Sequence, residues 1–110
     1  MAIIAAQSVP VAGLAEIVWG AAAGGGDEAP VGGGLLLLVR NIGAGSLTAT
    51  IATPRTVRGI PIADVALTVA AGDVAAVPMD TVYRSPSTGR ASITYDVATD
   101  AEVAVLRVAR

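Results

Sequence analysis

The sequence predicts an all-β protein: a single antiparallel β-sandwich or jelly roll of about seven to eight short strands, with an extended N-terminal arm. Short segments in which apolar and polar residues alternate recur along the chain, and glycine, proline, asparagine or aspartate separates them. No apolar pattern of helical period runs for the length of a helix. At 110 residues the chain can bury one hydrophobic core. We therefore expect an arm over residues 1–13 and one β-sandwich domain over residues 14–110.

The first third of the chain has the weakest pattern. Residues 1–13 are mostly apolar but too short to form a stable helix alone, so we expect an arm that docks on another surface. Leu14 to Trp19 is a plausible first strand. Residues 20–34 contain seven glycines and no periodic pattern, which predicts a long flexible loop.

Two hairpins are predicted in the middle of the chain. The apolar run at 35–39 favours a strand covered on both faces, and a glycine-rich turn joins it to the alternating segment 46–51. The second hairpin pairs segments 64–69 and 74–79 across a turn that contains Gly72.

The last two strands are expected over 91–97 and 102–108. The closing strand is apolar on both faces, with Val103 and Val105 on one and Ala104, Leu106 and Val108 on the other. One face can serve the core, while the second needs a cover from a neighbouring sheet of this chain or from a second subunit. The core lacks phenylalanine, so oligomerisation or docking would offset its modest burial.

The composition excludes most catalytic and nucleic-acid-binding classes. Histidine and cysteine are absent, and all seven basic residues are arginines scattered along a chain of net charge −2. A nucleic-acid footprint needs a basic patch, which this chain lacks. The apolar runs are shorter than the roughly 20 residues of a membrane span, and the N-terminal stretch lacks the positive region of a cleaved signal peptide. We expect no enzyme, nucleic-acid ligand or membrane partner.

Neither the carboxylates nor the glycine runs predict a metal or a cofactor. Asp73 and Asp100 occupy predicted turns, and no Asp-x-Asp-x-Asp spacing of a calcium loop occurs. The glycine triplets at 24–26 and 32–34 are not followed by the Gly-Lys-Ser/Thr of a phosphate-binding loop. A hydrolase with paired carboxylates is the remote enzymatic alternative. We expect no catalytic residue, metal, cofactor or small-molecule substrate.

Seven residues are candidates for contact with a protein partner. The apolar arm and the second face of the last strand fit poorly into one small core. Trp19, the single tryptophan, is either a contact anchor or a cap on one end of the core. The arginines of the exposed connection 54–61 either bind an acidic surface or are simply solvated. The candidates are Ile3, Ile4, Trp19, Arg55, Arg58, Leu106 and Val108.

The order of motifs in the second half resembles a known family. Asn41-Ile42-Gly43-Ala44-Gly45 is followed by a Thr-rich strand, a Thr/Val strand ending in Ala71-Gly72, a strand from Gly89 to Tyr95, and the apolar strand ending at Val108. This succession, over residues 35–108, is similar to that of small head proteins of tailed bacteriophages that infect high-GC bacteria. Relatives often carry Gly-Pro-Phe after the second hairpin, where this chain has Val77-Pro78-Met79.

The resemblance implies a capsid decoration, or cement, protein. Such a protein assembles in the host cytoplasm onto the outer surface of the capsid, often as a homotrimer, and clamps neighbouring subunits of the major capsid protein. The alternative is a non-catalytic binding module, such as a carbohydrate-binding sandwich or a domain of a receptor-binding fibre. Both interpretations place function in contact with another macromolecule.

Overall fold

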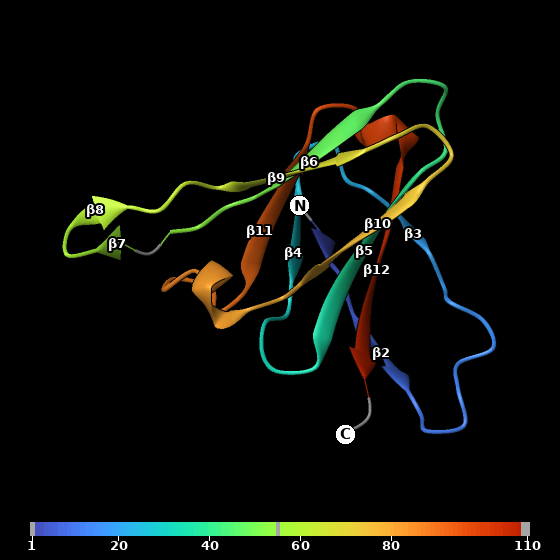
Figure 1. Cartoon of the computed structure of the whole chain (residues 1–110), viewed down its shortest axis with the longest axis horizontal. Helices are drawn as coiled ribbons and strands as arrows, with labels where there is room; N and C mark the ends of the chain where they lie inside the picture. The colour runs from blue at the N-terminus through green and yellow to red at the C-terminus, as the bar shows by residue number, and fades with distance from the viewer. Residues whose placement is uncertain (1, 55, 109–110) are drawn as a thin grey trace.

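The computed structural model describes residues 2–54 and 56–108, and these residues form an all-β protein, as the sequence predicts (Figure 1). Sheet 1 contains, in spatial order, β1 (Ala2–Ile3), β4 (Asp27–Ala29), β11 (Ala91–Tyr95), β6 (Leu47–Ile51) and β9 (Val65–Val69). Sheet 2 contains β10 (Val74–Pro78), β5 (Leu35–Asn41), β12 (Ala101–Val108) and β2 (Ala6–Val9), with β3 (Gly20–Ala21) also paired to β12. Strands β7 (Thr56–Val57) and β8 (Ile60–Pro61) form a separate hairpin. Two 3-10 helices, η1 (Thr81–Tyr83) and η2 (Ala98–Asp100), precede β11 and β12.

The inward-facing side chains of both sheets meet in one core. Strands β5 and β12 pair over seven residues at the centre of sheet 2, and their alternate side chains are buried against those of β6 and β11. The core consists mainly of small aliphatic groups, and its fully buried members include Leu37, Val39, Leu47, Ala49, Ile51, Ile93 and Val105. The core faces of β6, β11 and β12 agree with the predicted period-two alternation.

Both predicted hairpins are wrong. Strand β5 does not pair with β6, and β9 does not pair with β10, because the turn after each first strand leads the chain into the other sheet. Strand β5 pairs instead with β10 in sheet 2, and β6 pairs with β9 in sheet 1.

Residues 2–9, predicted as an arm, extend both sheets. Strand β1 pairs in parallel with β4 in sheet 1, and β2 pairs in parallel with β12 in sheet 2. The N-terminal segment thus crosses from one sheet to the other, and these are the two parallel pairings among the described strands. Its docking surface includes the chain's own sheet edges.

Two predictions for residues 14–34 are wrong. Leu14 to Trp19 is not a strand. Within this segment the Gln7 side chain accepts from the Val18 N–H (2.9 Å) and donates to the Val18 carbonyl (2.7 Å). A side chain thus satisfies main-chain groups that a strand would pair through its ladder. The glycine-rich stretch is not a continuous loop either, because it contains β3 and β4.

The outer face of sheet 2 is partly covered within the chain. Arg40 and Glu102 lie opposite each other on this face and form an ion pair. The Arg40 guanidinium lies 4.5 Å from the centroid of the Trp19 ring, within cation–π range. Ala104 and Leu106, on the same face of β12, are buried. The second face of the closing strand is therefore buried at Ala104 and Leu106, whereas Val108 at its end is 47% exposed.

Asn41 holds two turns together. Its buried side-chain amide donates to the carbonyls of Gly45 (2.7 Å) and Val69 (3.0 Å), and its Oδ1 accepts from the Gly43 N–H (2.9 Å). These bonds fix the turn after β5 and join it to the end of β9. The Asn-x-Gly-x-Gly motif therefore has a packing role in this fold.

We expect Asn41→Ala to lower the free energy of unfolding by about 2–3 kcal/mol, because it leaves buried main-chain groups without partners. Chemical denaturation would measure the loss. Asp73→Ala, at an exposed side chain in the neighbouring turn, is the matched control and should change stability by no more than about 0.5 kcal/mol. Equal stability of Asn41→Ala and the wild type would contradict the assigned role.

Candidate functional site

The β7–β8 hairpin projects away from both sheets, at one end of the molecule (Figure 1). Val57 pairs with Ile60, so Arg58 and Gly59 form a two-residue turn, and both have positive φ, 53° and 80°. This geometry fits a type I′ turn, whose twist matches that of the flanking strands. Arg58 is the single non-glycine residue with positive φ among residues 2–54 and 56–108. The turn places its side chain at the tip of the projection.

The hairpin exposes apolar side chains that the core does not use. Val57 is 60% and Ile60 68% exposed, and Arg58 between them is also exposed. Residues 54–63 contain no acidic residue, although the whole chain is net negative. The hairpin is therefore an apolar and basic projection, suited to an apolar surface with acidic groups at its rim. Arg55, also predicted as a contact residue, lies outside the described residues.

Three other candidates surround a cavity beside the N-terminal strands. Ile3, Ile4 and Trp19 are among the residues that line a space of about 350 Å³. Ile3 is 59% exposed, whereas Ile4 is half-buried and packs against the core. Trp19 is also half-buried, with one face of its ring against Arg40. The structure thus brings together residues that the sequence offered as separate contact points.

The remaining two candidates lie near the end of β12. Leu106 is buried on the outer face of sheet 2, whereas Val108 is 47% exposed and pairs with Val9 of β2. Neither residue lines the cavity, although Ala104, which precedes Leu106 on the same face of β12, does. The six candidates that the structure describes therefore do not all belong to one site.

Asp27, which the sequence analysis did not select, lies at the cavity with its side chain buried. Its Oδ2 accepts from the Tyr95 hydroxyl (2.8 Å) and from the Ala23 N–H (3.3 Å). Gly26, at φ 99°, precedes it so close to β11 that a Cβ would lie 2.8 Å from the Ile93 carbonyl oxygen. A glycine at 26 thus permits the approach that carries Asp27 inward. In the sequence, Asp27-Glu28 is an isolated acidic pair in a glycine-rich stretch, and this pattern does not indicate a buried carboxylate.

Tyr95 should give stability a dependence on alkaline pH. Burial, followed by the hydrogen bond to Asp27 and the charge of Asp27, raises the pKa of Tyr95 well above its usual value. The folded chain therefore retains a proton that the unfolded chain releases above about pH 10. The stabilisation is fully present below that pH and is lost as the pH rises through the folded-state pKa. Lysine and cysteine side chains also titrate at alkaline pH, but the chain contains neither. Few other groups therefore change their protonation in the pH range where Tyr95 is expected to act.

Urea unfolding at a series of pH values would test this dependence. We expect the free energy of unfolding of the wild type to fall above about pH 10, and the fall to be smaller in Tyr95→Phe. An unchanged fall in Tyr95→Phe would assign the pH dependence to another group.

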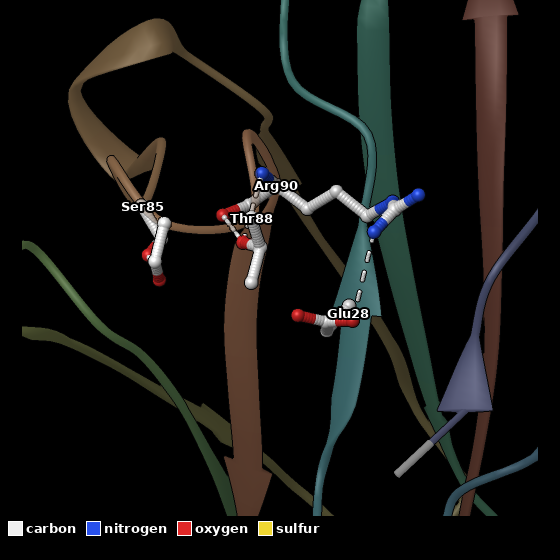
Figure 2. Close-up of polar contacts among 5 residues, drawn as sticks. Glu28, Ser85, Thr88 and Arg90 are labelled. Carbon is white, nitrogen blue, oxygen red and sulfur yellow. Dashed lines mark hydrogen bonds and ion pairs between the residues drawn. The ribbon is translucent and has the colours of Figure 1, made fainter.

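Hydroxyl and charged groups of the loop before β11 form a separate polar cluster (Figure 2). Thr88 Oγ1 accepts from the Arg90 N–H (3.2 Å), and the Ser85 and Ser87 hydroxyl oxygens lie 3.0 Å apart. The Arg90 guanidinium reaches Glu28 of β4 at 3.8 Å. These contacts close the loop on itself and fasten it to β4, which is a structural role.

The described part of the chain was compared with two patterns, a cluster of metal-ligating side chains and a membrane-spanning helix. Within residues 2–54 and 56–108, no three or more His, Cys, Asp or Glu side chains are grouped to hold a metal ion. No helix over the same ranges is long and apolar enough to cross a membrane.

Comparisons of the chain with protein-family models, with curated proteins and with solved structures found no match.

Proposed function

We propose that this chain is a capsid decoration protein, which binds the outer surface of a phage head and stabilises contacts between major capsid subunits. In this proposal it carries no catalytic site, assembles onto heads in the host cytoplasm and acts as a homotrimer. The order of strand and turn motifs over residues 35–108 supports it, because that order resembles small head proteins of tailed bacteriophages.

The observation that carries the proposal is the exposed hairpin. Val57 and Ile60 present apolar side chains on a projection fixed by a type I′ turn. The type I′ turn closes the hairpin, and it holds Arg58 in a backbone conformation that costs a residue other than glycine roughly 1–3 kcal/mol. A projection that inserts between partner subunits gains from apolar side chains at its tip. We therefore assign the hairpin to the contact with the major capsid protein.

The proposal also includes the finer fold, a β-sandwich or jelly roll. Two five-stranded sheets that share one core support this architecture. The N-terminal strands at the edges of both sheets add main-chain pairing that joins the two layers. Such a frame would hold the hairpin rigidly at one end of the molecule.

Co-sedimentation with purified heads tests the proposed function. The heads should be assembled from the major capsid protein encoded in the same genome, in a gene expected to lie beside this one. We expect the chain to pellet with assembled heads, to remain in solution with free capsid subunits, and to sediment alone as a trimer. A strict monomer that does not bind heads would contradict the proposal.

A further inference from the structure

The carboxylate of Asp27 has one unsatisfied oxygen inside the protein. Asp27 is 1% exposed. Among residues 2–54 and 56–108, its Oδ1 is the one buried side-chain oxygen or nitrogen without a hydrogen-bond partner. A buried acceptor that has given up water without gaining a partner costs about 1–3 kcal/mol, and more when it is charged. Oδ1 has almost no accessible surface in the free chain. A donor that reached it from the adjoining cavity, after a shift of the side chains that cover it, would recover that free energy.

The other oxygen of Asp27 is already held. Oδ2 accepts from the Tyr95 hydroxyl and the Ala23 N–H. The raised pKa of Tyr95 keeps its hydroxyl protonated as a donor over the physiological range. These two bonds fix the carboxylate group in place. Oδ1 is therefore a fixed acceptor, as a selective binding site requires.

Among residues 2–54 and 56–108, Asp27 is also the single residue with a charged side chain that lines the cavity of about 350 Å³. This volume lies within the range of roughly 300–1,000 Å³ that is typical of small-molecule sites. The wall is mostly apolar, with Ile4 and Val103 among its members, and Trp19 adds an aromatic group. Gln7 also lines the cavity, but both ends of its amide are engaged by Val18. The cavity thus combines a hydrocarbon wall with one negative group in need of a donor.

We propose that this cavity binds an alkylammonium group, whose N–H donates to Oδ1 of Asp27 and whose carbon chain packs against the apolar wall. A free primary amine and the lysine side chain of a partner protein share this chemistry. The chain contains no lysine, so its own side chains do not supply the group. This site is independent of the proposed function, because none of its lining residues belongs to the β7–β8 hairpin. Strands β3 and β4, which contribute lining residues, lie apart from that hairpin (Figure 1).

Titration of the whole chain with butylammonium, followed by NMR, tests the proposal. We expect saturable shifts of the Gly20 and Ala21 amides and of the Trp19 indole N–H. Butanol, which has the same carbon chain with a neutral head, should bind at least about 10-fold more weakly, since a hydrogen bond to a charged group contributes more than a neutral one. N-acetyl-lysine amide and N-acetyl-norleucine amide form a second pair. Binding of butylammonium alone assigns the site to a small amine, and binding of the lysine compound as well admits a partner's side chain.

Asp27→Asn provides the matched variant. Asparagine has the same shape and can keep the bond from Tyr95, but it carries no negative charge. The preference for butylammonium over butanol should disappear in Asp27→Asn and persist in Asp73→Asn, at an exposed position. If Asp27→Asn fails to fold, the titrations of the wild type with butylammonium and with butanol still show whether the cavity prefers the charged head group. Equal affinity for butylammonium and butanol, or no saturable binding of butylammonium, would overturn the proposal.

Discussion

Replacing Val57 and Ile60 together with aspartate should weaken binding to assembled heads by at least about 100-fold, equivalent to about 2.7 kcal/mol. Both side chains are largely exposed in the free chain and lie next to the turn of the projecting hairpin. If they are buried on binding, each contributes roughly 1.5–3 kcal/mol, and a buried aspartate adds the cost of desolvating a charge. Binding isotherms from co-sedimentation would measure the loss.

The same variant should fold as stably as the wild type, because neither side chain belongs to the core. We expect its free energy of unfolding to change by no more than about 0.5 kcal/mol. Ile42→Asp is the matched control, since Ile42 is 58% exposed and lies in the turn after β5 rather than in the hairpin. This control should bind heads normally. Loss of trimers instead of loss of head binding would place the hairpin between copies of the chain.

Leu37→Ala should lower the free energy of unfolding by about 2–5 kcal/mol, which is the usual cost of removing a buried leucine side chain. Leu37 is fully buried in β5, the strand between β10 and β12. Small domains are stable by only about 5–15 kcal/mol, so the loss would be a large share of the total. A core without phenylalanine has few large side chains to fill the resulting cavity.

The neighbouring Leu36→Ala is the control for this experiment. Leu36 lies on the opposite face of the same strand and is half-buried, so its truncation should cost less. Denaturant unfolding at one fixed protein concentration would compare the two, because subunit association also adds to apparent stability. An equal loss from both variants would mean that the outer face of sheet 2 stabilises the chain as much as the core does.

Local sequence pattern predicted the strands that carry their own signal. The apolar run from Leu35 became the central strand of sheet 2, and the segments around Ile51 and Val69 became neighbours in sheet 1. In the segments around Ile51 and Val69 the alternation of side chains identifies the buried face before any partner is known. A turn does occur at Gly72, whose positive φ of 79° suits glycine, but it joins the two sheets instead of closing the predicted hairpin. Local pattern located the strands and the turn, and it assigned the wrong partners to the strands.

Contacts between distant parts of the chain were beyond such prediction. The segment 14–19, predicted as a strand, is not one, and the main chain of Val18 within it is hydrogen-bonded by the side chain of Gln7. The parallel pairing of β2 with β12 joins residues about a hundred positions apart, for which the sequence holds no local signal. The candidate residues Ile3, Ile4 and Trp19 were selected from sequence, but the buried Asp27 that gives their cavity its chemistry was not.

Electron cryomicroscopy of assembled heads incubated with this chain would show whether it decorates capsids. We expect added density on the outer surface of the capsid, with three copies around local three-fold positions. We also expect the hairpin from Thr56 to Pro61 to touch the major capsid protein. Heads that carry no added density at saturating concentrations of the chain would contradict the proposed function.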